Sequence, residues 1–314
     1  AQCLTTGIGI GSIALSRDGS AFAYTKVIER SNIWSIPIVP DCTLAIDNAH
    51  ALTSENHYID ILSVSPDGQR IAFDSNRSGN QDIWVMRKDG NELRQLTTNS
   101  AHDWVGSWSP DGNQIAFHSL RKGNRDIFVM PVAGGPVVQL TNHPAEEFFP
   151  IWSPDGEKIT FTSNRSGNME IWIIPSTGGE AQQLTFCTVQ GVSWSPDGTR
   201  LVFSSKCTGS SELFLIPAEG GKPAQLTHGE WLEVNPCFWS SDGQMIYAYG
   251  TGRSSHEGVN LWEISISNGT ARSLIDFKGS MMEPSLLSSD GERLYFTLWE
   301  RLGDLWMAEL SSGN

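Results

Sequence analysis

Acidic side chains recur at one place in a repeated pattern, shortly before a turn of the form Ser-Xaa-Asp-Gly. The residues are Asp60, Asp103, Glu147, Glu233 and Glu283. Carboxylate oxygens are the ligands that hard cations such as Ca2+ prefer, and carboxylates that converge also attract a basic segment of a partner. We therefore expect ligand binding at these positions, with Asp103, Glu147 and Glu233 as candidate calcium ligands. Acidic loop residues that only face solvent are the plainer interpretation of the same pattern.

Histidines and large aromatic residues accompany these carboxylates. Four histidines lie in the same connections, namely His57, His102, His143 and His228. Grouped imidazoles can bind transition metals, but the distances from these histidines to the next turn differ, so we expect them at different heights. The aromatic residues can anchor a partner or pack between neighbouring repeats. Of these, Trp104, Phe148 and Trp231 are candidate ligand-binding residues.

The sequence offers no arrangement typical of a serine hydrolase. Such an enzyme needs a Gly-Xaa-Ser-Xaa-Gly nucleophile turn on an α/β domain, and neither pattern is present. Arg77 and Arg165, and the acids at Asp82 and Glu170, each recur from repeat to repeat. Repetition favours a structural role, because a catalytic group would be expected once. We therefore assign no catalytic residue.

The placement of all these residues depends on a repeated unit, which is clearest from Trp152 to Thr185. The segment Ser153 to Gly156 predicts a tight turn, because its Pro presets φ and its Gly accepts a positive φ. Residues 159–162 alternate as a strand does, and residues 171–174 are apolar throughout, which is typical of a strand covered on both faces. A Gly-Gly turn then leads to a last short strand. Each unit is therefore predicted as four short antiparallel strands.

The unit recurs along the whole chain. The aspartate of its turn stands at Asp18, Asp67, Asp111, Asp155, Asp197, Asp242 and Asp290. A period of about 40 to 45 residues with four strands per unit is typical of a β-propeller, whose stacked blades cover each other's faces. We therefore predict one all-β domain over residues 1–314, a seven-bladed propeller of four-stranded antiparallel blades. The last unit lacks its outer strand, and we expect residues 1–6 to close the ring, with Gln2 to Thr6 beside Leu305 to Leu310.

Composition narrows the range of partners. The chain has 35 acidic and 21 basic residues, a net charge of −14, which opposes binding to nucleic acid or anionic lipid. No apolar run approaches the length of a membrane span and no leader opens the chain, so we expect neither membrane insertion nor an export signal of its own. The five cysteines show no metal-ligand spacing, and their redox state stays open.

Three motifs of the repeat resemble those of one family. They are Trp-Ser-Pro-Asp-Gly at Trp108, Trp152 and Trp194, Ser-Asn-Arg-Ser-Gly-Asn at Ser75 and Ser163, and Asp-Ile-Trp-Val at Asp82. The pattern resembles the TolB-like, or PD40, propeller repeats. The resemblance implies a bacterial, periplasmic or otherwise extracytoplasmic propeller that binds a protein or small ligand without catalysis. TolB itself has six blades and an additional N-terminal domain, so its role in envelope assembly is not carried over.

Similar propellers imply two other functions. Some metal-dependent polysaccharide lyases, such as oligogalacturonate lyase, are seven-bladed propellers with a His-ligated metal in the channel, but an acidic rim argues against a polyanionic sugar. Similar arrays also form the propeller part of larger peptidases, kinases and transcriptional regulators. We favour a monomeric binding or sensor propeller with its ligand at the channel mouth. Its cofactor, if it has one, is a calcium ion in the central channel.

Overall fold

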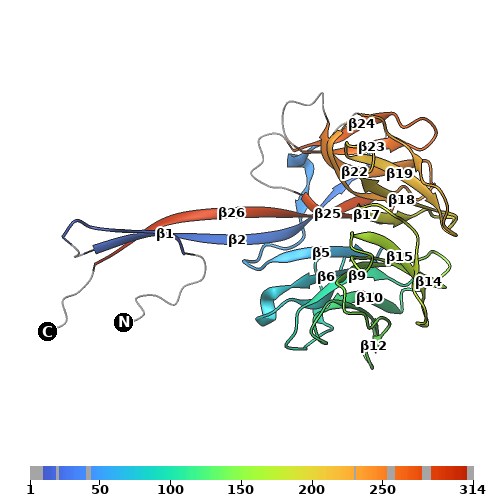
Figure 1. Cartoon of the computed structure of the whole chain (residues 1–314). Coiled ribbons are helices and arrows are strands. Elements are labelled where there is room, and N and C mark those ends of the chain that lie inside the picture. Colours follow the sequence, from blue (N-terminus) through green and yellow to red (C-terminus); the bar gives the residue numbers. More distant parts are fainter. Residues whose placement is uncertain are drawn as a thin grey trace.

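The computed structural model describes residues 10–18, 21–39, 44–229, 231–252, 259–277 and 284–309. Over these residues the chain forms a six-bladed β-propeller from which a β-arm extends (Figure 1). The predictions of an all-β propeller and of four-stranded antiparallel blades are confirmed, and the prediction of seven blades is wrong. The helices described are single 3-10 turns, η1 (Ile46–Asn48) and η2 (Asn76–Ser78). In the described part of the chain, no helix has the length and apolar character that crossing a membrane requires.

Blades 1 to 4 each use four consecutive strands, with the first strand lining the central channel. Blade 1 consists of β5 (Ile59–Val64), β6 (Arg70–Ser75), β7 (Asp82–Arg87) and β8 (Arg94–Gln95). Blade 2 consists of β9 (Asp103–Trp108), β10 (Gln114–Ser119), β11 (Asp126–Pro131) and β12 (Val138–Gln139). Blade 3 consists of β13 (Glu147–Trp152), β14 (Lys158–Ser163), β15 (Glu170–Pro175) and β16 (Gln182–Gln183). Blade 4 consists of β17 (Val189–Trp194), β18 (Arg200–Ser205), β19 (Glu212–Pro217) and β20 (Ala224–Gln225).

Blades 5 and 6 include strands from distant parts of the chain. Blade 5 consists of β21 (Trp231–Trp239), β22 (Met245–Gly252), β23 (Asn260–Ser265) and β24 (Ala271–Asp276). The short β3 (Leu44–Ala45) adds a parallel strand to its outer edge. Blade 6 consists of β25 (Pro284–Ser289), part of β26 (Arg293–Glu309), part of β2 (Ala21–Pro37) and β4 (His50–Ala51). The ring is therefore closed by two strands from each end of the chain.

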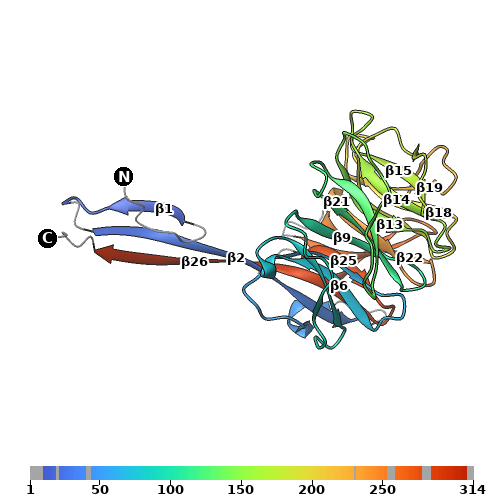
Figure 2. The same ribbon diagram turned by 90° about the horizontal axis from the view of Figure 1, so that it is seen from below.

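The arm is the continuation of blade 6. Strands β2 and β26 are each 17 residues long and pair antiparallel over their whole length. β25 pairs with β26 only at Leu294–Leu298, and β4 pairs with β2 only at Trp34 and Ser35. The other halves of both strands project from the propeller, where β1 (Ile10–Leu15) joins the edge of β2 (Figure 2). The arm is therefore a three-stranded extension outside the ring.

The number of blades follows from the connection between the second and third strands of each unit. In blades 1 to 4 this connection contains a glycine at positive φ, namely Gly79, Gly123, Gly167 and Gly209. The first unit has Thr-Lys-Val-Ile-Glu-Arg-Ser at residues 25–31, without glycine, and its β-branched pair favours extended backbone. The last unit has a glycine here, Gly303, but it also runs on as one strand through residues 297–304, where it pairs with the extended first unit. The two end units are thus drawn out into long strands that together supply one blade and the arm.

The predicted ring closure needs a corresponding correction. Gln2 to Thr6 lie outside the described residues. The segment from Leu305 to Glu309, which was expected in the last blade, lies in the arm and pairs with Ala21–Thr25. Blade 6 instead closes the ring through β2 and β4, and pairing within one blade removes the open edges that the ring would otherwise present.

The repeated turn and the core have the predicted form. In the turn that begins at Ser153, the Ser153 hydroxyl donates to Asp155 Oδ1 at 2.5 Å, and Gly156 has a φ of 76°. The second strands carry fully buried phenylalanines that pack between blades, including Phe73, Phe117, Phe161 and Phe203. Burying a phenylalanine side chain stabilises a fold by about 1.5 to 3 kcal/mol. Stacking of equivalent blades therefore builds the core, which holds the inner strands around the channel.

Candidate ligand site in the central channel

A cavity of about 510 Å³ lies in the central channel, and all six inner strands contribute to its wall. Its apolar lining consists of Ile61, Leu62, Val105, Phe149, Ile151, Val192, Phe238, Tyr249 and Leu287. Its polar lining consists of Asp60, Gln190 and the serines Ser63, Ser107, Ser193 and Ser288. A second cavity of about 440 Å³ lies further along the channel and shares Ser63 and Phe238 with the first. The dimensions and the mixed lining are typical of a small-ligand site.

The inner strands are irregular at the level of this cavity. Each of β5, β9, β13, β17, β21 and β25 shifts register against its neighbour. The residues at these shifts include Gly106, Phe149 and Gly191, and all three line the cavity. Phe149 has a φ of 51°, and its side chain is 41% exposed. Bulges of this kind redirect side chains next to functional sites, and a non-glycine residue at positive φ is strained.

Asp60 and Asp74 form a pair of carboxyl groups beside the cavity. Asp60 lies on β5 and lines the wall, while Asp74 lies on the adjacent β6 and is fully buried. Asp74 accepts hydrogen bonds from the Ile61 N–H at 2.9 Å and from Gln81 Nε2 at 2.6 Å. Burial and the nearby Asp60 carboxylate raise the pKa of Asp74 to about 8. Burial also raises the pKa of Asp60. Burial therefore opposes the ionised form of both carboxyl groups.

Two of the predicted calcium ligands lie elsewhere, in buried ion pairs. Asp103 is fully buried and binds Arg121 at 2.8 Å, and Glu147 is fully buried and binds Arg165. Both arginines come from the loop after the second strand, the Ser-Asn-Arg-Ser-Gly position of the repeat. Each stacks on core rings, as Arg121 does on Phe117 at 4.9 Å. In blades 2 and 3, each ion pair therefore joins the start of the inner strand to the loop after the second strand of the same blade.

The other predicted ligand residues are dispersed. Trp104 stacks on His102 and His118 with ring centroids 5.5 and 5.2 Å apart, and Arg125 lies over both Trp104 and Phe148. Trp104 and Phe148 therefore pack between blades 2 and 3. Glu233 is exposed on β21. The side chain of Trp231 and the whole of Glu283 lie outside the described residues.

No metal-binding group is formed by the part of the chain that the structure describes. In these residues, no three His, Cys, Asp or Glu side chains come together as metal ligands would. His102 Nδ1 accepts a hydrogen bond from the Gln81 N–H, and His143 Nδ1 accepts one from the Ala145 N–H. His57 lies 3.9 Å from Glu55 and is substantially exposed, and His228 is exposed. Calcium in the channel stays a prediction. Of the acidic residues predicted to bind a ligand, Asp60 lies on the cavity wall.

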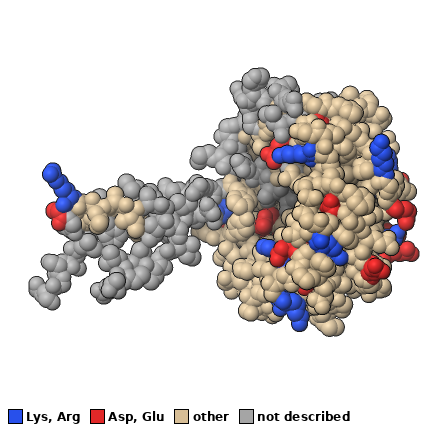
Figure 3. Space-filling model, viewed as in Figure 1, with Lys and Arg blue, Asp and Glu red and all other residues tan. Residues whose placement is uncertain are grey.

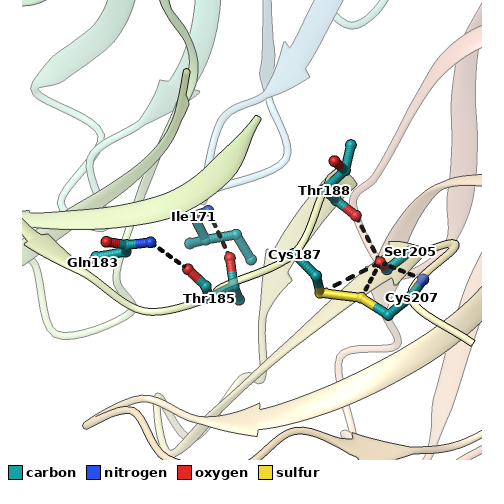
Figure 4. Close-up of a disulfide and its surroundings, with 7 residues drawn as sticks. All are labelled: Ile171, Gln183, Thr185, Cys187, Thr188, Ser205 and Cys207. Carbon is teal, nitrogen blue, oxygen red and sulfur yellow. Dashed lines mark hydrogen bonds between the residues drawn. A yellow bond between two sulfur atoms is a disulfide. The ribbon is translucent and has the colours of Figure 1, made fainter. Parts of the chain in front are cut away.

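A disulfide in blade 4 takes the place of the ion pairs in blades 2 and 3. Cys187 and Cys207 are joined with a Cα–Cα distance of 6.1 Å (Figure 4). Cys207 stands where the repeat has Arg121 and Arg165, and Cys187 lies two residues before Val189, which stands where the repeat has Asp103 and Glu147. The Ser205 hydroxyl lies against both sulfurs and donates to the Thr188 carbonyl at 2.6 Å. The same two segments are thus joined covalently in this blade.

Asp74, Gln190 and Tyr249 are site residues that the sequence-based prediction omitted. Asp74 was detectable, because the corresponding residues in the next three repeats are His118, Thr162 and Ser204. A carboxylate that replaces a neutral side chain inside a predicted buried strand indicates a special role. Gln190 and Tyr249 had no such signal. Elsewhere, charges of both signs are interspersed over the propeller in Figure 3 and form no continuous field of one sign on the face that is shown.

Most of the repeats match models of known protein families. Residues 10–137 and 119–193 match the model of the TolB beta propeller domain, PD40, which thus covers more than half of the chain. Residues 184–300 match the model of the dipeptidyl peptidase IV N-terminal region. An uncharacterized protein of Agrobacterium fabrum is 31% identical over 90 residues, which is 28% of this chain and 29% of that protein. The match therefore spans less than a third of this relative.

Solved structures share the fold. A protein assigned as TolB from Agrobacterium tumefaciens superposes with a TM-score of 0.69 and 20% identity, covering 87% of this chain and 99% of that one. TolB from Acinetobacter baumannii has a TM-score of 0.57 and 19% identity, covering 80% of this chain and 66% of that one. A puromycin hydrolase has a TM-score of 0.57 and 14% identity, covering 90% of this chain and 47% of that one. At these identities the likeness concerns the fold alone.

Proposed function

The chain belongs to the TolB β-propeller family, and from this premise we propose that it is a non-catalytic binding propeller with its ligand in the mouth of the central channel. The observation that carries the proposal is the cavity of about 510 Å³ into which all six inner strands project. A ligand there contacts every blade, so its binding would be sensed by the whole ring. The ligand is a small molecule or a short segment of a partner protein.

An extracytoplasmic location fits the same proposal. The Cys187–Cys207 disulfide is of a kind that persists in oxidising compartments such as the periplasm and is rare in the cytosol. The net charge of −14 opposes nucleic acid as the partner. We further propose a monomer, because the six blades close into a ring within one chain and no blade needs a second copy to complete it. Light scattering of the purified chain tests that state.

The binding proposal is tested by ligand-observed NMR with a library of neutral, cationic and anionic fragments. The variant Gln190→Trp places a large ring at the cavity mouth, on an exposed position that should tolerate it. We expect fragments to bind the wild type and to lose binding in this variant. The matched control is Gln69→Trp, an exposed glutamine in the turn between β5 and β6 that lines neither channel cavity. Equal binding to all three proteins, or to none, would overturn the proposal.

A second candidate is that this propeller is one part of a larger peptidase. The match of residues 184–300 to a dipeptidyl peptidase N-terminal region favours it, and the fold of a puromycin hydrolase agrees. In that case the channel would admit substrate to a separate catalytic domain. The reading frame around the present sequence distinguishes the candidates, because a peptidase would require an α/β-hydrolase segment carrying a Gly-Xaa-Ser-Xaa-Gly turn.

A further inference from the structure

The Cys187–Cys207 disulfide lies near the surface of blade 4. Cys207 is exposed and Cys187 is partly exposed. Lys206 and Thr208, on the two sides of Cys207, are also exposed, and Phe186, next to Cys187, is 80% exposed. A dissolved thiol can therefore reach the bond while the fold stays intact. Exposed disulfides are typically the labile or regulatory ones, whereas structural disulfides resist reduction.

Blade 4 depends on this bond in a way that its neighbours do not. The ion pairs of blades 2 and 3 hold the start of the inner strand, and a reductant leaves them unchanged. At the two corresponding positions blade 4 has Val189 and Cys207, which cannot form an ion pair. Without the covalent bond, the two segments remain joined by the pairing of Val189 with Ser205 and by the hydrogen bond from the Ser205 hydroxyl to the Thr188 carbonyl. Reduction would therefore loosen the start of β17 in this blade alone.

The start of β17 is also part of the cavity wall. Gln190, Gly191 and Val192 line the channel cavity, and this stretch begins three residues after Cys187. β17 shifts register against β18 between Gln190 and Val192, and Gly191 has a φ of 58°. A strand is held less firmly where its ladder is interrupted, so the disulfide has a larger share in fixing the residues before the shift. The position of the wall in blade 4 therefore depends on the oxidation state of the bond.

We propose that the Cys187–Cys207 bond is a site of reversible thiol–disulfide exchange with a dithiol reductant, and that its reduction releases the channel wall of blade 4. A thiolate of the reductant attacks Sγ of Cys207, the more exposed residue of the two, and the bond to Cys187 breaks. Cys187 leaves as a thiolate and takes up a proton from water. The second thiol of the reductant loses its proton and attacks the reductant's own sulfur in the mixed disulfide, which releases Cys207 as a thiolate that is protonated in turn. The protein disulfide is thus reduced by two electrons, and the dithiol is oxidised to a disulfide.

The rate of reduction by dithiothreitol in increasing urea tests whether the folded protein reacts. Alkylation followed by peptide mass spectrometry counts the thiols at Cys187 and Cys207 individually. We expect the rate to rise in proportion to the dithiothreitol concentration and to stay constant in urea below the unfolding transition. The free energy of unfolding falls linearly with denaturant, so a rate that climbs exponentially with urea would show that the bond opens only in the unfolded chain. That result would overturn the proposal.

Single variants test which sulfur is attacked. In Cys187→Ser, iodoacetamide should alkylate Cys207 faster than it alkylates Cys187 in Cys207→Ser, because Cys207 is the more exposed residue. Peptide mass spectrometry again identifies the alkylated residue, and circular dichroism establishes that both variants are folded. Equal rates, or the reverse order, would contradict the assignment of Cys207 as the attacked residue.

Hydrogen–deuterium exchange of the oxidised and the reduced protein measures what the bond holds. Reduction should speed exchange in residues 186–194 at least about tenfold. The equivalent segments of blades 2 and 3, residues 102–108 and 146–152, are internal controls and should not change, because ion pairs hold them. The double variant Cys187→Ser with Cys207→Ser should exchange like the reduced protein. Unchanged exchange in residues 186–194, or faster exchange throughout the ring, would overturn the proposal.

The consequence for ligand binding rests on the proposed function of the channel. A fragment that binds the oxidised protein should bind the reduced protein more weakly, and reoxidation should restore its affinity. If no fragment binds either form, the binding function is wrong, while the urea and exchange experiments still decide whether the disulfide reacts and what it holds. Equal affinity of a fragment for both forms would contradict the link between the bond and the ligand.

Discussion

Asp74 is a carboxyl group in a place where the fold otherwise uses neutral side chains. It is fully buried on β6, and the pKa of about 8 means that it is mostly protonated at neutral pH. A buried carboxyl group normally costs stability once it ionises, because its charge loses the hydration it had in the unfolded chain. Its position next to the cavity-lining Asp60 supplies a functional reason for keeping it.

The titration of Asp74 predicts how stability depends on pH. The pKa is raised from 3.8 to about 8, so between these values the folded chain binds more protons at this group than the unfolded chain. The stability that this group contributes is complete below about pH 4 and is lost as pH rises toward about 8. The free energy of unfolding should therefore fall less steeply with pH in Asp74→Asn, by up to about 1.4 kcal/mol per pH unit. Urea unfolding at pH 5, 6, 7 and 8 measures it, with Asp89→Asn as the control. Equal slopes in wild type and Asp74→Asn would contradict the pKa assignment.

The ion pairs of Asp103 and Glu147 make these residues structural in a measurable way. Each carboxylate is fully buried against an arginine that also stacks on core rings. Neutralising one partner leaves a buried guanidinium without its counter-charge, which costs about 3 to 5 kcal/mol. Asp103→Asn and Glu147→Gln should each lower the melting temperature markedly, with or without millimolar calcium. Glu233→Gln, an exposed acid, is the control and should change it little. Variants as stable as the wild type would show that these pairs contribute nothing.

The limits of the sequence are visible in these residues. The sequence predicted that Asp60, Asp103 and Glu147 share a structural phase. Asp103 and Glu147 are the first residues of their inner strands, whereas Asp60 is the second residue of β5. It did not show that Arg121 and Arg165 would reach back to two of them, because residues 18 positions apart meet only through the hairpin geometry. In blade 1 the corresponding arginine, Arg77, binds Glu55 at 3.2 Å. A register shift of each inner strand then decides which residues face the cavity, and no residue pattern encodes that shift.

At the scale of elements, the loop after the second strand decides between blade and arm. Where it carries Ser-Asn-Arg-Ser-Gly, the glycine at positive φ turns the chain and a hairpin forms. Where the turn residues are replaced by Val27 and Ile28, the chain continues as β2 for 17 residues. The repeat count was correct as a count of sequence units. It failed as a count of blades because an antiparallel partner, β26, was similarly extended and could pair along the whole length.

The disulfide of blade 4 is predicted to stabilise the same element that ion pairs stabilise in its neighbours. Cys187 and Cys207 are 20 residues apart, and closing a loop of this size stabilises a fold by about 3 kcal/mol. Reduction, or Cys187→Ser with Cys207→Ser, should lower stability by that order and leave the blades intact. Cys187→Ser with Cys207→Arg and Val189→Glu, which imitates blade 3, should recover part of the loss. Differential scanning calorimetry of the four forms tests this. No loss on reduction would mean that the bond adds nothing to the fold.

At the scale of the whole molecule, the ring and the arm depend differently on the ends of the chain. The core of blade 6 uses Ile33 and Ile36 from β2 and Leu294, Phe296 and Leu298 from β26, all fully buried. These residues lie in the inner halves of the two strands, where β25 and β4 also pair. The outer halves are paired with each other and with β1, beyond the blade (Figure 1). Closure of the ring therefore requires only the inner halves.

Truncation at two different points separates these contributions. A chain of residues 30–300 keeps the inner halves of β2 and β26 and should form the complete ring, with a melting temperature within a few degrees of the full chain. A chain of residues 38–300 also lacks Ile33 and Ile36, so it loses the strand that covers β26 in blade 6. It should unfold at a much lower temperature or aggregate, because a long strand edge and buried apolar surface become exposed together. Circular dichroism melts and light scattering compare the two. If residues 30–300 behave like residues 38–300, the arm is part of the cooperative unit, and the ring cannot be described without it.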